Sequence, residues 1–200
     1  MGRASFREKI IEAGLVEFYQ QGYNASGVRD ISEAAGVPLG SFTNHFRSKE
    51  AFALEVLDRY FAELQSTMEA TLLDEARPPL DRLDAYFDTI EGILASSGWR
   101  YGCMVTNMAL EVPEHSELIR ARLVEIFAGL TEPFASAVRA AQAEGDVRCD
   151  RDAEDLAAFL LSGWHGALLR MKVERSSDAI KRFRRVLAAV LSDGWSQGTG

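Results

Sequence analysis

The sequence predicts an all-α protein of about nine helices. Apolar residues recur at helical spacing along nearly the whole chain, and strict apolar–polar alternation, which marks a half-buried strand, persists nowhere. Runs of β-branched residues, which favour strands, are few. Of the 200 residues, 47% are hydrophobic and 26% are charged, which is the balance of an ordinary globular protein and excludes disordered, collagen-like and disulfide-stapled chains.

The first predicted helix begins at a capping box and ends at a glycine. In this box Ser5 and Glu8 are expected to accept hydrogen bonds from each other's backbone N–H groups. Gly22 is expected to end the helix. The apolar residues recur along one face, which consists of Phe6, Ile10, Ala13, Gly14 and Phe18.

Two shorter helices follow, and the turn between them suggests a helix-turn-helix. Ser26 is expected to cap the first, Val28 to Ala35, and Pro38 to open the second, Leu39 to Phe46. The tight turn between them contains Gly36. The second helix of such a motif fits the major groove of B-DNA. Turns of this kind are also common in packed helical proteins, so the outline leaves both interpretations open.

Six longer helices are expected behind this motif, separated by proline, glycine and serine breaks. Their approximate ranges are 49–74, 80–94, 101–110, 115–144, 156–171 and 180–191. Pro133 should kink or restart the fourth of them. The last two carry wide apolar stripes, which predict a four-helix bundle with a second copy of the chain, although packing within one subunit is the alternative. The expected interface residues are Leu156, Phe159, Leu160, Gly163, Ala167, Leu168, Phe183, Val186, Leu187 and Val190.

Hydrogen-bonding and cationic side chains gather on the third helix and at its edges. The helix carries Ser41, Thr43, Asn44 and His45, and an asparagine amide can pair with adenine through two hydrogen bonds. The nearby cations are Arg29, Arg47 and Lys49. The free N–H groups at the start of the fourth helix also suit a phosphate oxygen. Each residue taken singly could be a solvated surface group, but the clustering favours a DNA-binding surface.

The stretch VRDISEAAGV, followed by GSF, HF and SKEAF, resembles the DNA-binding domain of the TetR/AcrR family of bacterial transcriptional repressors. The resemblance covers about Ser5 to Phe61 and implies a DNA-binding domain in residues 1–49 and an effector-binding and dimerisation domain in residues 50–200. It also implies a homodimer that binds a palindromic double-stranded DNA operator and is released by a small-molecule effector.

The same resemblance suggests which residues approach DNA. They are Ser26, Gly27, Arg29, Pro38, Leu39, Gly40, Ser41, Thr43, Asn44, His45 and Lys49. Two positions depart from the family pattern, because Leu39 stands where lysine is frequent and Thr43 where tyrosine is nearly universal. These departures should weaken nonspecific affinity, or they could supply apolar contacts to a thymine methyl group.

The effector pocket is expected among the helices of residues 50–145. The segment Tyr101 to Met104, together with Lys172, is similar to the electrophile- and oxidant-sensing branch of the family. This similarity implies that Cys103 reacts and that Lys172 favours its thiolate form. A buried cysteine acting as a small hydrophobic residue, a solvated lysine and a plain aromatic core are the alternatives. The expected effector-binding residues are Cys103, Lys172, Phe61, Tyr86, Phe87, Met104, Asn107, Met108, Phe127 and Trp164.

The charge distribution bears on the DNA partner. A net charge of −8 argues against nucleic acid for the chain as a whole. Residues 1–50 nevertheless hold equal numbers of basic and acidic residues, so the whole acidic excess lies in residues 51–200. DNA binding should then use few phosphate contacts and depend weakly on salt.

Other classes of protein are disfavoured. The sequence contains no GxSxG, phosphate-binding glycine loop or HExxH motif, so an enzyme is not expected. Its histidines, His45, His115 and His165, are far apart, and neither a metal site nor a cofactor is expected. Two cysteines without a CxxC motif, a charged amino terminus and no apolar run of about 20 residues predict a cytoplasmic protein without membrane contact. A helical ligand-binding protein without DNA binding is the alternative function.

Overall fold

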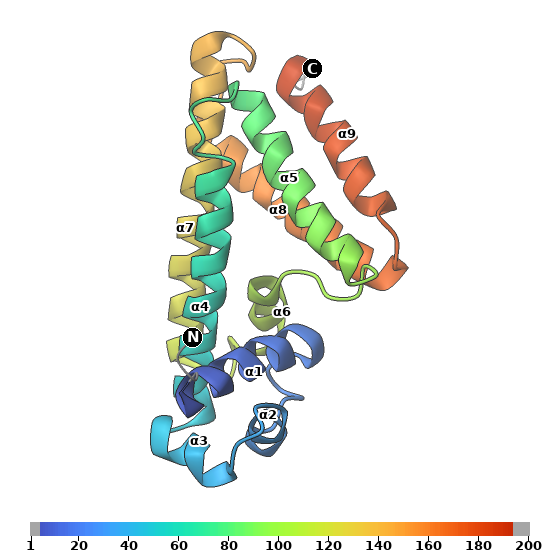
Figure 1. The fold of residues 1–200 in the computed structure, drawn as a ribbon. Helices are drawn as coiled ribbons and strands as arrows, with labels where there is room; N and C mark the ends of the chain where they lie inside the picture. The colour runs from blue at the N-terminus through green and yellow to red at the C-terminus, as the bar shows by residue number, and fades with distance from the viewer. Residues whose placement is uncertain (1–4, 194–200) are drawn as a thin grey trace. The chain divides into compact units, whose positions relative to one another are not determined.

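The computed structural model describes residues 5–193, and this part of the chain is all-α, as the sequence predicts (Figure 1). Its nine helices are α1 (Phe6–Gln21), α2 (Val28–Ala34), α3 (Leu39–His45), α4 (Lys49–Ala70), α5 (Pro79–Ser96), α6 (Met104–Glu111), α7 (Glu117–Glu144), α8 (Ala153–Glu174) and α9 (Asp178–Asp193). Within the described range no helix is both long and apolar enough to cross a membrane.

The described residues form two compact units. The first contains the chain up to Leu64 together with Cys103–Ile126, and the second contains Gln65–Gly102 together with the chain from Phe127 onward. The units therefore divide inside α4 and α7, and α6 belongs with the three amino-terminal helices. The functional boundary expected between residues 49 and 50 stays a prediction.

Aromatic packing on α4 organises the first unit. The Phe52 ring lies 5.7 Å from Phe18 of α1, 5.0 Å from Phe42 of α3 and 4.8 Å from Phe46, measured between ring centroids. All four rings are buried, and their edge-on contacts add to the free energy gained from burial. Figure 1 shows α2 and α3 packed beside α1 in this unit. Because Gly14 has no side chain, α1 can lie directly against Phe52.

Three details of the first helices differ from the expectation. Ser5 caps α1 by accepting a hydrogen bond from Glu8 N–H at 3.2 Å, but the Glu8 carboxylate accepts one from Arg59 rather than from Ser5. Phe6, expected on the apolar face, is 49% exposed, whereas Ile11, which was not expected there, is buried. Gly27 is the N-cap of α2 instead of Ser26, because the Ser26 hydroxyl donates to the Gly22 carbonyl at 2.7 Å.

Tertiary packing also overrides a local signal in α7. The helix continues from Glu117 to Glu144 through Pro133, so the expected restart does not occur. A proline removes one backbone hydrogen bond. The adjacent Leu130, Phe134 and Ala137 are buried, and this packing stabilises the helix on both sides of the proline.

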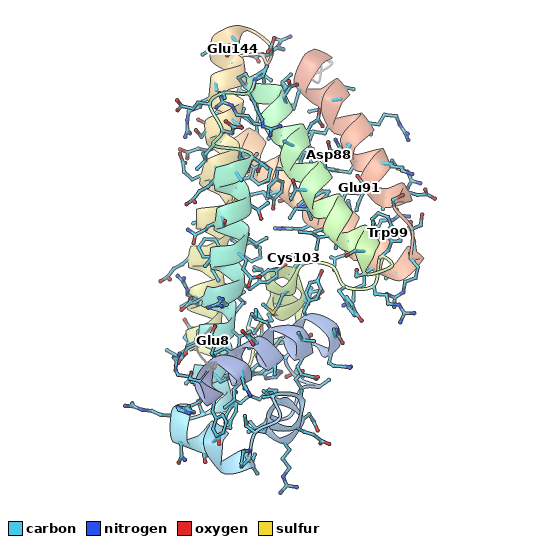
Figure 2. The ribbon with its side chains drawn as sticks, in the orientation of Figure 1. Glu8, Asp88, Glu91, Trp99, Cys103 and Glu144 are labelled. Carbon is cyan, nitrogen blue, oxygen red and sulfur yellow. The ribbon has the colours of Figure 1, made fainter. Side chains whose placement is uncertain are left out.

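The second unit has its own aromatic core. Phe87 of α5 lies 4.8 Å from Trp164 of α8 and 5.6 Å from Phe183 of α9, measured between ring centroids. A Cβ atom at Gly163 would lie 2.9 Å from the Phe183 ring, so these two helices approach closely within one chain. Arg184 joins α9 to α5 through ion pairs with three carboxylates, Asp84, Asp88 and Glu91, of which the last two are labelled in Figure 2.

Two glycine substitutions should have opposite effects on stability. In Gly14→Ala the new Cβ would lie 2.2 Å from the Phe52 ring, so we expect the free energy of unfolding to fall by about 1–3 kcal/mol. Gly92 lies inside α5 with open space around its Cα. Gly92→Ala should therefore raise the free energy of unfolding by about 0.5–1 kcal/mol, the helix-propensity difference. Urea unfolding followed by far-ultraviolet circular dichroism measures both, and a Gly14→Ala variant as stable as the parent would contradict the packing described above.

Candidate nucleic-acid interface and regulatory cysteine

The recognition candidate α3 has one buried face and one polar exposed face. Phe42 and the following Phe46 are buried against Phe52, and this contact fixes the rotation of the helix about its axis. The side chains left exposed are Leu39, Thr43, Asn44 and His45, with Ser41 half-buried. Pro38 is the N-cap, which places the start of the helix at the expected residue.

The exposed face keeps free hydrogen-bonding capacity. The Thr43 hydroxyl donates to the Gly40 carbonyl at 3.1 Å, which leaves its oxygen able to accept. Among the described residues, neither the Asn44 amide nor the His45 imidazole has a hydrogen-bond partner. An asparagine amide that projects from a rigid helix without a partner can hydrogen bond with a base edge without first breaking a bond within the protein.

Two arginines beside α3 are also free to bind an anion. Arg29 on α2 and Arg47 after α3 are exposed and form no ion pair within the described part of the chain. The other arginines that the structure describes in the first unit are held by carboxylates, as Arg59 is by Glu8 at 2.8 Å. A guanidinium group without a carboxylate partner is a strong donor to phosphate oxygens.

Three other expected DNA residues are engaged within the protein. Ser26 is only 1% exposed, and its hydroxyl is bonded to Gly22. The Gly27 N–H group donates to the Asp30 carboxylate at 3.1 Å. The Lys49 ammonium donates to the Tyr23 carbonyl at 2.5 Å and lies 4.3 Å from the centre of the Tyr23 ring. Burial lowers the pKa of Lys49 from its ordinary value, while the nearby Glu111 carboxylate opposes this shift. Contacts from these three residues to DNA stay predictions.

Cys103 occupies a defined position at the start of α6. It is the N-cap residue of that helix and is 8% exposed (Figure 2). The next backbone N–H, that of Met104, donates to the Tyr60 hydroxyl at 3.4 Å. Burial raises the pKa of Tyr60 well above its ordinary value, and the nearby Cys103 side chain raises it further. The contact of Tyr60 with the start of α6 is not predicted from the sequence, because no spacing rule connects two residues so far apart in the chain.

The other expected effector-binding residues are distributed over both units. Cys103, Phe61, Met104, Asn107 and Met108 are buried in the first unit. The second unit contains Tyr86, Phe87, Phe127, Trp164 and Lys172. In the second unit Tyr86, Phe87 and Trp164 belong to the aromatic core. A common pocket and the pairing of Cys103 with Lys172 stay predictions.

The expected dimer residues divide into an inner and an outer set. Leu160, Ala167, Leu168 and Leu187 are buried within the chain, and Leu156 is partly buried. Phe159 and Val186 are 59% and 54% exposed. A groove of about 330 Å³ runs between α8 and α9, and its apolar lining includes Phe159, Gly163, Phe183, Val186 and Val190.

Two family models match the chain. One, described as bacterial regulatory proteins of the tetR family, matches residues 10–56, and the other, described as a tetracyclin repressor-like C-terminal domain, matches residues 79–187. The HTH-type transcriptional repressor DhaR of Mycobacterium sp. (strain GP1) is 39% identical over 96% of this chain and 94% of its own length.

Solved structures show the same likeness. The regulatory protein TetR from Rhodobacter sphaeroides has a TM-score of 0.89 at 33% identity, covering 92% of this chain and 98% of that chain. The reduced form of Escherichia coli NemR has a TM-score of 0.83 at 25% identity, covering 91% of this chain and 94% of that chain.

Substitutions on the exposed face should separate phosphate contacts from base contacts. If Arg29 and Arg47 each bind one phosphate, Arg29→Ala and Arg47→Ala should each reduce the slope of log affinity against log salt by about 0.9. Asn44→Ala should leave this slope unchanged but reduce the preference for a selected duplex over a scrambled one by about 1–3 kcal/mol. Fluorescence anisotropy with labelled duplexes measures both quantities.

The exposed Lys181 on α9, in the other unit, provides the control, and Lys181→Ala should bind like the parent. If Arg29→Ala, Arg47→Ala and Asn44→Ala all bind like the parent too, this face does not contact DNA.

Proposed function

The chain belongs to the tetR family of bacterial regulatory proteins and is a DNA-binding transcriptional repressor, not an enzyme; from this premise we propose how it reads DNA and how it is released. Two copies bind a palindromic operator through their α3 helices. A small molecule, most simply a reactive electrophile, then releases the dimer from the operator. The observation that carries the DNA part is the unpartnered polar face of α3 with its flanking arginines.

The division of roles follows from the chemistry of that face. Arg29 and Arg47 hold phosphates and so set the position of the protein on the duplex. Asn44 and His45 reach base edges in the major groove, where each base pair presents a distinct pattern of donors and acceptors. Leu39 is 42% exposed and suits the methyl group of thymine. Experiments on Arg29, Arg47 and Asn44 test this part of the proposal.

The groove between α8 and α9 supports a homodimer. In a twofold arrangement the same groove on each copy meets its counterpart, and the four helices form a bundle. The exposed Phe159 and Val186 side chains would then be buried against the second copy. Two α3 helices about 34–36 Å apart would match successive major grooves on one side of the duplex.

Cys103 is the candidate sensor. It is the N-cap residue of α6 and the one cysteine of the first unit, and its sulfur is a nucleophile for soft electrophiles. Addition to an α,β-unsaturated carbonyl compound would form a bond from sulfur to the β-carbon and leave the thiol proton on the α-carbon. The solved structure of the relative NemR is that of its reduced form, which supports a redox-sensitive group in that protein and, by likeness, a cysteine sensor here. Because Cys103 is buried, the adduct would have to displace neighbours of α6, and this would favour a form with lower DNA affinity.

A charge placed on the groove should break the dimer. In Phe159→Glu a carboxylate would be buried at the interface of both copies, so we expect the dimer dissociation constant to rise by about 100-fold or more. Val173→Glu is the matched control, since Val173 lies on the same helix, is 83% exposed and does not line the groove. Sedimentation equilibrium distinguishes monomer from dimer, and an unchanged Phe159→Glu dimer would place the interface elsewhere.

Replacement of the candidate sensor should abolish release by an electrophile. Treatment with N-ethylmaleimide should lower the DNA affinity of the parent by about tenfold or more, a coupling free energy in the usual range for allosteric proteins. Cys103→Ser should retain full affinity after treatment, whereas Cys149→Ser, which removes the exposed cysteine, should respond like the parent. Mass spectrometry verifies which cysteine carries the adduct. If N-ethylmaleimide released Cys103→Ser from DNA as fully as it releases the parent, Cys103 would not be the sensor.

A further inference from the structure

We propose that Glu111 and Lys49 are positioning residues for DNA binding, because they hold the loop Gly22–Asn24 from α6 and α4. We call this group of residues the clasp; it consists of Glu111, Lys49 and the loop residues 22–24 that both of them contact. The clasp connects the last residue of α6 to the loop before α2 and to the first residue of α4. All of its parts lie in the first unit.

Glu111 fits the loop closely. Its carboxylate accepts a hydrogen bond from the Asn24 backbone N–H at 2.9 Å, and its own carbonyl accepts one from the Asn24 side chain at 3.5 Å. A Cβ atom on Gly22 would lie 2.3 Å from the Glu111 carboxylate, so the carboxylate packs directly on the glycine backbone. Gly22 has a φ of +87°, a conformation that other residues rarely adopt. The missing side chain of Gly22 thus leaves the space that the Glu111 carboxylate occupies.

Lys49 holds the same loop from α4. Its ammonium donates to the Tyr23 carbonyl at 2.5 Å and lies over the Tyr23 ring, which in turn packs on Phe18 at 5.6 Å. Tyr23 and Lys49 flank α2 and α3 in the chain, since Tyr23 precedes α2 and Lys49 begins α4, the helix after α3. Their contact therefore joins the two ends of the helix-turn-helix.

A second link holds the segment that follows α6. The Ser116 hydroxyl, just before α7, donates to the Glu50 carboxylate in the first turn of α4. Residues 111–116 are thereby attached at one end to the loop before α2 and at the other to the start of α4. A displacement of α6 along its axis would act on both ends of the helix-turn-helix at once.

The direction of the change in DNA affinity on removal of Glu111 distinguishes a positioning role from an effect of its charge. Glu111 is an acid beside a proposed DNA-binding surface, so its removal would by charge alone strengthen binding to DNA. The clasp requires the opposite, because without Glu111 the loop and α2 lose a fixed orientation. The inference rests on the proposed role of α3 and does not require Cys103 to be the sensor.

The test uses the full-length protein and a duplex of about 30 base pairs selected by it from a random pool, long enough for two half-sites one turn apart. Glu111→Ala should lower affinity by about tenfold, and Glu111→Gln by less, because the amide oxygen can still accept from Asn24. Glu114→Ala, which removes an exposed carboxylate three residues away, should not lower affinity. Hydrogen exchange of the Asn24 amide should be faster in Glu111→Ala, while thermal unfolding verifies that the variants are folded.

Lys49→Met distinguishes the clasp from a phosphate contact. The clasp predicts weaker binding with an unchanged salt slope, and no further loss when Lys49→Met is combined with Glu111→Ala. A phosphate contact predicts a slope reduced by about 0.9 and additive losses, which would overturn the role proposed for Lys49. Equal or tighter binding by Glu111→Ala would overturn the role proposed for Glu111. Failure of the parent to select a duplex, or of Arg47→Ala to change the slope, would instead count against the proposed function.

Discussion

The packing of the buried Phe52 ring is the interaction on which the proposed DNA-binding surface depends. This single side chain of α4 contacts Phe18 of α1 and Phe42 of α3. It also contacts Phe46, the residue that follows α3. The candidate recognition helix α3 has seven residues, too few to be stable in isolation, so its conformation comes from this packing. The rings also determine which side of α3 faces water. The polar face is therefore a consequence of an aromatic core, and its groups are held in place before any ligand arrives.

Electrostatics within the first unit explain how an acidic protein can present a DNA-binding surface. Several of its carboxylates are paired with particular arginines, as Glu8 is with Arg59 and Asp58 with Arg122. These arginines contribute little to the external field, whereas Arg29 and Arg47 have no such partner among the described residues. The net charge of −8 describes the whole chain and says little about this surface. Whether an arginine is paired with a carboxylate thus decides whether its guanidinium group is available to bind a phosphate.

Local signals in the sequence account for most of the fold. The bounds of α1 and α3 follow from Ser5, Gly22 and Pro38, because caps and breakers act on the adjacent backbone. Sequence analysis assigned the cap of α2 wrongly, since Ser26 bonds backward to Gly22 rather than forward into the helix. Of the kink or restart expected at Pro133, the restart does not occur, and the buried neighbours of the proline stabilise the continuous helix. The Glu111–Asn24 contact spans 87 residues of sequence, and no local pattern carries such information. For the same reason Lys49 could be assigned to phosphate from its position next to α3, while its partner Tyr23 could not be foreseen.

The missing side chain at Gly163 shapes the groove between α8 and α9. It admits the edge of the Phe183 ring, which a methyl group would displace. Both Gly163 and Phe183 line the groove. A methyl group at residue 163 would therefore change the position of the ring and the shape of the groove together. A second copy of the chain would be recognised there by its fit to a depression that Arg170 and Arg182 also line, so shape and charge together would determine which related proteins can join it in a mixed dimer.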